Sequence, residues 1–209
     1  MLKILCVGPQ WRGSNAGGLF KALSRQNCLI DIVDEFYDIP LQNQSLHTRI
    51  IGKISRSFFI NDHNQQLWDK VLSFRPNVVL VYKGAFIQPE TLIKIKKRDI
   101  LLINFYPDVS FHTHGNLLKK TLPLYDCIIT TKTFGQHDMK QQLGVDNSYF
   151  IPHGFDPDIH RPINCIDASF QCEASFIGTW SPKKELYLKE LIEKLPSLKL
   201  KIWGSQWQQ

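Results

Sequence analysis

The feature that most constrains this chain is a regular alternation of apolar runs with helical patterns between residues 2 and 151. Several apolar runs are continuous, which is typical of strands buried on both faces of a parallel sheet. Strands are expected at 2–7, 29–33, 77–82, 100–105, 127–131 and 148–151, and helices at 16–25, 62–74, 89–97, 117–122 and 135–143. The alternation predicts an α/β fold with a Rossmann-like, doubly wound parallel sheet.

Local residues mark several helix ends. Asn61 or Asp62 is placed to cap the helix that ends at Phe74. Pro89 suits the first turn of the next helix, where a missing N–H costs nothing. Gly144 follows a helical pattern and is expected to end it.

The segment from Gln42 to Phe59 interrupts the alternation. Its apolar residues recur at near-helical spacing with basic residues around them, which predicts an amphipathic helix with a basic face. Such a helix either covers the sheet as an ordinary surface element or makes a peripheral contact with acidic groups, on an acceptor or at a membrane surface. Both interpretations stay open.

The composition changes after Ile151. Residues 152–162 hold three prolines and a glycine, as linkers do. A new pattern follows, with strands expected at 174–178 and 198–203 and a helix at 182–195.

These changes predict three regions: an N-terminal domain over 1–155, a proline-rich linker over 156–171 and an incomplete second Rossmann-like domain over 172–209. The last region is near the lower size limit for an independent core. It is therefore expected to pack against the first domain, to pair with another chain, as in a homodimer, or to belong to a longer protein.

Charge indicates the kind of partner, and cysteine content indicates the cellular compartment. The net charge of +6 favours an anionic partner, but no dense Lys or Arg run indicates specific nucleic-acid binding. Five cysteines without a CxxC pair indicate reduced thiols in a cytoplasmic protein. No apolar run approaches the length of a membrane span.

A glycine-rich loop, GPQWRGSNAGG at 8–18, joins the first expected strand to the first helix. Backbone N–H groups of such a turn and of the helix N-terminus can bind an anion. The glycine spacing matches neither GxGxxG nor GxxxxGK[ST], so no named cofactor is predicted. The loop is either a tight connection or one side of a ligand site.

Polar residues also follow the other expected strands. Asp108 or His112 can accept a proton from a hydroxyl nucleophile, at the strand end where open α/β sheets bind ligands. His112 and His114 could instead form a metal pair or simply hydrogen-bond within the loop. No further ligands stand at a suitable spacing, so no metal is expected.

Two lysines, Lys83 and Lys132, follow other strands and would face the same crevice if the strands are parallel. The alternative is that each is a solvated lysine. The stretch GTWSPKK at 178–184 repeats the arrangement of strand, small residues, helix N-terminus and positive charge. Two such turns, on either side of a linker, indicate a ligand held in a cleft.

Several segments together resemble the CgeB-type (spore maturation protein) glycosyltransferases. The matching stretches are RPNVVLVYKG at 75–84, NFYPD at 104–108, IPHGFDPDIHRP at 151–162, and FIGTWSPKKEL at 176–186 with Trp203–Gly204. The resemblance runs over nearly the whole chain. It implies a GT-B architecture of two Rossmann-like domains and transfer of a sugar from a nucleotide-sugar donor. No cofactor or metal is implied, since helix N-termini and basic side chains stabilise the departing diphosphate.

The resemblance also implies roles for individual residues. Asp108 or His112 would be the base of an inverting reaction. Gly17 and Gly18 would lie near the donor phosphates, Gly178, Thr179 and Lys183 would line the donor pocket, and Trp11, Arg12, Lys83 and His153 would lie on the acceptor side or in the cleft. The acceptor, whether sugar, lipid-linked molecule or protein, is not identified.

Two other hypotheses stay open: a non-catalytic module that binds a nucleotide or polyanion, and an inactive fragment that pairs with another chain. Members of the resembled family continue well beyond the position of Gln209. We therefore expect weak or absent transferase activity from this chain alone.

Overall fold

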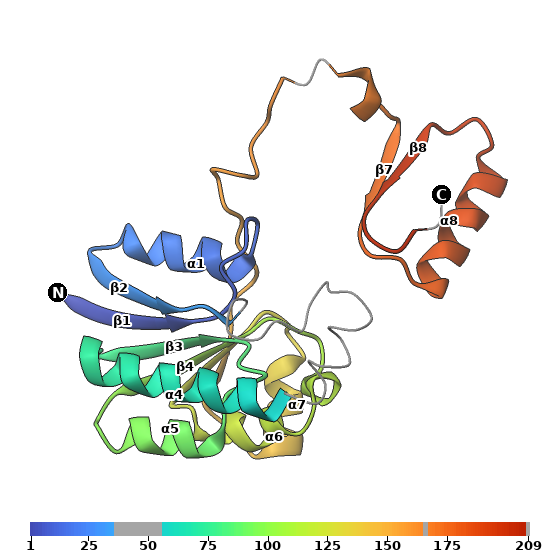
Figure 1. Cartoon of the computed structure of the whole chain (residues 1–209). Coiled ribbons are helices and arrows are strands. Elements are labelled where there is room, and N and C mark those ends of the chain that lie inside the picture. Colours follow the sequence, from blue (N-terminus) through green and yellow to red (C-terminus); the bar gives the residue numbers. More distant parts are fainter. Residues whose placement is uncertain (36–55, 165–166, 208–209) are drawn as a thin grey trace. The chain divides into compact units, whose positions relative to one another are not determined.

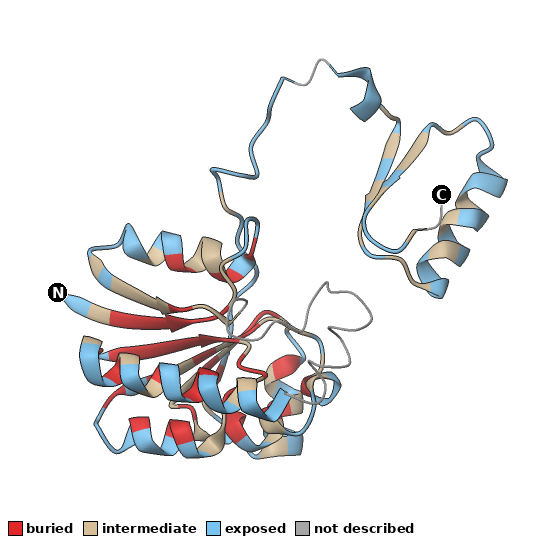
Figure 2. Cartoon of the chain, viewed as in Figure 1, coloured by how far each residue is buried: buried red, intermediate tan, exposed pale blue. Residues whose placement is uncertain are grey.

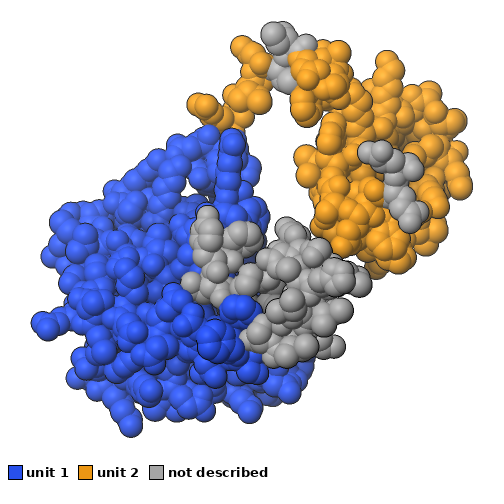
Figure 3. All heavy atoms as spheres, viewed as in Figure 1, with its two compact units in different colours: residues 1–160 blue, residues 161–209 orange. Residues whose placement is uncertain are grey.

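A computed structural model describes residues 1–35, 56–164 and 167–207. The chain divides into two compact units, residues 1–160 and 161–209 (Figure 3). Each unit contains a parallel sheet of its own (Figure 1).

Unit 1 is built on a six-stranded sheet in the order β2-β1-β3-β4-β5-β6, and every strand pair is parallel. The strands are β1 (Leu2–Val7), β2 (Cys28–Val33), β3 (Val78–Tyr82), β4 (Leu101–Tyr106), β5 (Cys127–Thr130) and β6 (Ser148–Phe150). The chain runs from β1 outward to β2 and then returns to the other side of β1 with β3. This reversal is the point where doubly wound sheets bind ligands, and it confirms the predicted fold class.

Helices cover the sheet of unit 1. They are α1 (Asn15–Ser24), α4 (Arg56–Phe74), α5 (Pro89–Lys96), α6 (Leu117–Thr121) and α7 (Gly135–Leu143), with short 3₁₀ turns η1 (Phe111–His114) and η2 (Leu122–Leu124). As expected, Pro89 lies in the first turn of α5, and Gly144 ends α7 in the left-handed conformation at φ 68°.

The core explains why the apolar runs in the sequence are continuous. Every residue of β3 is buried (Figure 2). A large apolar cluster includes Leu5 and Leu102 with Leu67 of α4, and a separate cluster includes Cys6 and Leu80 with Phe20 of α1. Because apolar side chains contact both faces, the strands do not alternate with polar residues.

The expected start of α4 is wrong. α4 begins at Arg56 and passes through Asn61 and Asp62, neither of which caps it. Both side chains have other partners, since Asn61 accepts a hydrogen bond from Gln88 at 2.7 Å and Asp62 accepts one from Gln66 at 2.9 Å. Of the expected basic helix 42–59, residues 42–55 lie outside the described residues, and the remainder forms the first turn of α4.

Unit 2 is a single strand–helix–strand unit, as its sequence pattern predicts. It contains η3 (Ala168–Phe170), β7 (Ala174–Ile177), α8 (Pro182–Lys194) and β8 (Leu200–Trp203), and β7 pairs with β8 in parallel. Ser181 caps α8 by accepting a hydrogen bond from the Lys184 amide. Within the three described ranges, no helix combines the length and apolarity that crossing a bilayer requires.

Candidate functional site

A cavity of about 610 Å³ opens at the carboxyl edge of the unit 1 sheet, next to the reversal between β1 and β3. The loops that follow β1, β3, β4 and β6 contribute its walls. Trp11, Lys83, Asp108, His114 and His153 are among the lining side chains. The structure thus brings together four residues that the sequence placed at separate strand ends, along with His114.

The polar centre of this cavity is Asp108. Its Oδ2 lies 2.9 Å from Nζ of Lys83 and 2.7 Å from Nε2 of His114. About a third of each side chain is exposed, from 24% for His114 to 35% for Asp108. A partly exposed carboxylate that lines a cavity can receive a proton from a hydroxyl group bound there.

His114 is held in its neutral form. Burial lowers the pKa of the His114 imidazole, and the nearby Lys83 ammonium lowers it further. The Asp108 carboxylate opposes both effects but does not outweigh them. At neutral pH, His114 therefore acts toward Asp108 as a neutral hydrogen-bonding group.

The backbone that presents Lys83 is strained. Lys83 has φ 68° and Gly84 has φ 79°. A Cβ added at Gly84 would lie 2.8 Å from Cγ1 of Val81, so glycine is required there. The turn is fixed from β4, because the Lys83 amide donates to the Phe105 carbonyl at 2.8 Å and Asn104 donates to the Lys83 carbonyl at 3.2 Å. Such strain persists only where neighbouring groups hold it, and it occurs often at functional sites.

Three rings, Tyr82, Phe105 and His153, lie close together at the carboxyl ends of the strands. Tyr82 and Phe105 stack with ring centroids 5.3 Å apart, and His153 lies 6.5 Å from Phe105. Burial raises the pKa of Tyr82 to about 12, although the Asn15 side chain lowers it in part. The Tyr82 phenol is therefore protonated at neutral pH.

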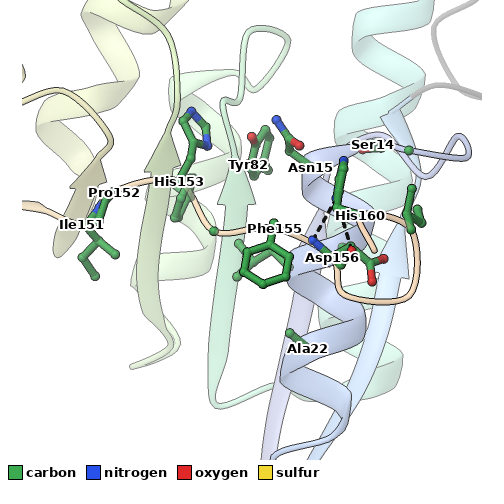
Figure 4. Close-up of a pocket in the computed structure, with 16 residues that line it drawn as sticks. Ser14, Asn15, Ala22, Tyr82, Ile151, Pro152, His153, Phe155, Asp156 and His160 are labelled. Atoms are coloured by element: carbon green, nitrogen blue, oxygen red, sulfur yellow. Dashed lines mark hydrogen bonds between the residues drawn. The ribbon is translucent and has the colours of Figure 1, made fainter. Parts of the chain in front are cut away.

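A second, smaller cavity of about 290 Å³ lies between α1 and residues 151–160 (Figure 4). Ion pairs fix this segment to α1. Lys21 pairs with Asp156 at 3.6 Å and with Asp158, and Arg25 pairs with Asp158 at 2.7 Å. The proline-rich stretch 152–162, which has the composition of a linker, therefore belongs to unit 1 as far as His160.

The predicted phosphate glycines are already engaged at the start of α1. The Gly17 amide donates to Oγ of Ser14 at 3.3 Å, and the Gly18 amide donates to the Ser14 carbonyl at 3.0 Å. Gly18 also faces Asp156, since an added Cβ would lie 3.6 Å from the Cβ of that residue. The two amide hydrogen bonds and the nearby Asp156 show that both glycines serve the close packing at the start of α1. Phosphate binding by Gly17 and Gly18 stays a prediction.

Gly17 and three other predicted residues of unit 1 do not line either of its cavities. His112 stacks on Phe111, and its Nε2 lies 2.6 Å from Oε1 of Gln142. Arg12 is exposed next to Trp11, and Lys132 follows β5 without lining a cavity. Of the two candidate bases, only Asp108 therefore faces the cleft.

The sequence interpretation missed Asn104 and Asn64, and it did not predict the contact of His114 with Asp108. His114 was considered only as a metal or loop residue, although it contacts Asp108. Asn104 and Asn64 are buried polar residues that hold the turn after β3, and Asn64 accepts a hydrogen bond from the Gln88 amide at 2.9 Å. An asparagine inside an apolar strand was the available signal. No group of three or more His, Cys, Asp or Glu side chains suited to a metal occurs in the part of the chain that the structure describes.

In unit 2 the predicted donor residues surround the turn after β7. The Gly178 carbonyl accepts a hydrogen bond from Nε1 of Trp207 at 2.8 Å, and the Thr179 carbonyl accepts one from Nζ of Lys184 at 2.8 Å. Lys183 is directed elsewhere, with Nζ 5.7 Å from the centroid of the Tyr187 ring. Lys184 is therefore the lysine that contacts this turn.

No known family model and no curated protein matches this sequence. Solved structures do show similarity over nearly the whole chain. The fold is of the GT-B type. A complex of S. aureus MnaA with UDP has a TM-score of 0.59 at 12% identity, and the match covers 99% of this chain and 63% of that one. The chain thus spans less than two thirds of the MnaA chain.

Two further solved structures have the same type of fold. UDP-GlcNAc 2-epimerase from Neisseria meningitidis, bound to UDP-GlcNAc, has a TM-score of 0.57 at 14% identity, with 98% of this chain and 67% of that one covered. The glycosyltransferase SnogD from Streptomyces nogalater has a TM-score of 0.50 at 11% identity, with 100% and 68% covered. These similarities establish a Rossmann-like fold.

Proposed function

We propose that this chain is part of a glycosyltransferase that moves a sugar from a nucleotide-sugar donor to a hydroxyl acceptor, and that it belongs with the CgeB-type enzymes. The observation that carries the proposal is the Asp108 carboxylate, paired with Lys83 and His114 in the cavity at the reversal point of the sheet. Two solved structures with this fold contain UDP and UDP-GlcNAc, which supports a nucleotide-sugar partner.

In the proposed reaction, Asp108 accepts the proton of the acceptor hydroxyl group. The acceptor oxygen forms a bond to the anomeric carbon while the bond from that carbon to the diphosphate oxygen breaks. The diphosphate leaves with the bonding electron pair. The Lys83 ammonium group, 2.9 Å from Oδ2, holds the Asp108 carboxylate in position for this step.

We place the donor at the opposite side of the reacting carbon. Within unit 1, Gly17 and Gly18 at the start of α1 are proposed to bind phosphate. Within unit 2, the turn of Gly178, Thr179 and Lys183 is proposed to bind the donor. Charge on the leaving group is stabilised by helix N-termini and lysine side chains, so we propose a metal-independent reaction without a bound cofactor. Trp11 and His153 are proposed to contact the acceptor.

The proposal is tested with the 209-residue chain, UDP-GlcNAc and a panel of acceptors, with UDP release and glycoside formation followed over long incubations. Asp108→Asn should lower turnover at least 100-fold, because it removes the general base. Calorimetry should show unchanged UDP affinity. Asp146→Asn is the matched control, because it removes an exposed carboxylate whose partner is Lys140.

Full turnover in Asp108→Asn would refute the assignment of the base. Binding of UDP without any sugar transfer would instead favour the non-catalytic binding module. Analysis of the products separates transfer from the alternatives, because an epimerase returns an altered UDP-sugar and a hydrolase returns free sugar.

A further inference from the structure

The smaller cavity of unit 1 has mainly apolar walls. Its apolar lining side chains are Leu19 and Ala22 of α1, Phe105 of β4, and Ile151, Phe155 and Ile159 of the following segment. The last three are 47%, 73% and 47% exposed. Large apolar side chains gathered around one cavity and left open to water are typical of a ligand site.

The polar residues of this cavity are largely occupied. The Asp156 carboxylate accepts a hydrogen bond from the Asp158 amide at 2.9 Å and pairs with Lys21. His160 is bonded to the backbone of Asp156, with its amide 2.8 Å from the Asp156 carbonyl. These contacts hold the segment in place and leave apolar surface as the main free lining.

The two cavities of unit 1 are adjacent and share part of their lining. Ser14, Asn15, Tyr82 and His153 line both of them. Figure 4 shows Tyr82 and Asn15 in the lining of the smaller cavity, together with Phe155 and Ala22. A single molecule can therefore extend from the charged residues at Asp108 to the apolar walls beside α1.

The volumes limit the size of such a molecule. The apolar cavity of about 290 Å³ is roughly twice the ~150 Å³ that accommodates a benzene ring, so it has room for roughly ten carbon atoms. The polar cavity of about 610 Å³ is large enough for one or two sugar rings. The carboxylate of Asp108 and the ammonium group of Lys83 can bind a hydroxyl-rich head.

We propose that these two cavities form one site for an amphipathic ligand. Its hydroxyl-bearing head lies at Asp108, and its apolar tail of roughly ten carbons lies between α1 and residues 151–160. In the context of the proposed function, on which this assignment of role rests, the ligand is the sugar acceptor.

The experiment measures the affinity of the full chain for n-alkyl β-maltosides with methyl, butyl, octyl and dodecyl tails. Each compound is kept below its critical micelle concentration in calorimetric titrations. Each buried methylene group should tighten binding roughly fourfold, so octyl maltoside should bind on the order of 100-fold more tightly than butyl maltoside. The gain from octyl to dodecyl should stop at about 16-fold, the contribution of two methylene groups, because a tail of roughly ten carbons fills the cavity.

Variants of α1 test where the tail binds. Ala22 is exposed and lines the cavity, so Ala22→Trp should fill it without disturbing the core. It should weaken octyl maltoside binding at least about tenfold and leave methyl maltoside unaffected. Ser24→Trp is the matched control, because Ser24 is exposed on the same helix and does not line the cavity.

Equal affinities for the methyl and octyl compounds would overturn the proposal. An affinity that keeps rising steeply from octyl to dodecyl would also overturn it. The same holds for equal losses of octyl maltoside affinity in Ala22→Trp and Ser24→Trp, since either result indicates general adsorption. Tail-dependent binding that Ala22→Trp removes, without sugar transfer to any maltoside, would support the amphipathic site and count against the proposed transferase.

Discussion

The two units have the same local pattern of parallel strands and helices, but they differ in burial. In unit 1, helices cover a six-stranded sheet, and side chains such as Leu5, Leu102 and Ile128 are completely buried. In unit 2, none of the residues described within 161–164 and 167–207 is buried, and Ile177 on β7 is 78% exposed. Local sequence patterns therefore suffice to specify strands and helices, whereas a closed core requires layers on both faces of a sheet.

The largest expected effect compares one apolar truncation in each unit. Leu102→Ala should lower the free energy of unfolding of unit 1 by about 2–5 kcal/mol, because it leaves a cavity on a central strand. Ile177→Ala should change unit 2 by less than about 0.5 kcal/mol, because the side chain is exposed. Peptide-resolved hydrogen exchange in denaturant measures each unit separately. Similar losses in the two units would show that their difference in burial does not govern stability.

A glycine substitution should reveal a tightly packed point of unit 2. A Cβ at Gly204 would lie 2.0 Å from the Gly178 carbonyl oxygen, and Gly204 has φ 145°. Gly204→Ala should therefore destabilise unit 2 by about 2 kcal/mol. Exchange should accelerate in peptides covering β7 and β8 and stay unchanged in unit 1. Gly154→Ala is the control, because no atom lies within 4 Å of its added Cβ.

A third variant tests whether the core of unit 1 also positions the site. Asn104→Val removes the hydrogen bond to the Lys83 carbonyl and should cost about 1.5 kcal/mol. Lys83 lowers the pKa of His114, so its release should raise that pKa, which NMR titration of the imidazole measures. Asn61→Val, at an exposed position, is the control. An unchanged His114 titration in Asn104→Val would show that Asn104 only packs.

The smallest effect concerns acid stability of unit 1. Burial raises the pKa of Asp126, but hydrogen bonds from Lys96 and from the Leu102 amide outweigh it and lower the pKa below its ordinary value. The carboxylate therefore stabilises unit 1 above the unfolded pKa of about 3.9, and this contribution is lost as the pH falls through the lower folded value.

Asp126→Asn removes this contribution. Its deficit should be below about 1 kcal/mol at pH 7 and should shrink toward zero in acid, as measured by urea unfolding at several pH values. Asp146→Asn, which changes an exposed pair with Lys140, should show a smaller deficit. A deficit that grows in acid would contradict the sign of the Asp126 shift.

Much of the fold could be predicted, because its signals are local. The bounds of β1 and α7 agree with the expected ranges 2–7 and 135–143. The start of α4 could not be predicted, since Asn61 bonds to Gln88, which is distant in sequence. A capping residue is identified by type from the sequence, but its partner depends on the packing of other segments.

The candidate site was predicted only in part. Strand order places Lys83 and Asp108 at the same edge, and the two side chains do meet. His112 was predicted as a candidate base and His114 only as a metal or loop residue, and the two lie two residues apart in the 3₁₀ turn η1. With three residues per turn, side chains two positions apart point in different directions. His114 consequently contacts Asp108, whereas His112 contacts Gln142.

The sequence by itself determined the α/β class, the parallel sheet and the placement of polar residues at strand ends, because hydrophobic periodicity and strand alternation are local properties. Only the tertiary structure decided that Asp108 is bound by Lys83 and His114, that the start of α1 is closed by Ser14, and that the segment after β6 encloses an apolar cavity. These features depend on contacts between residues far apart in the chain, whose directions no local pattern encodes.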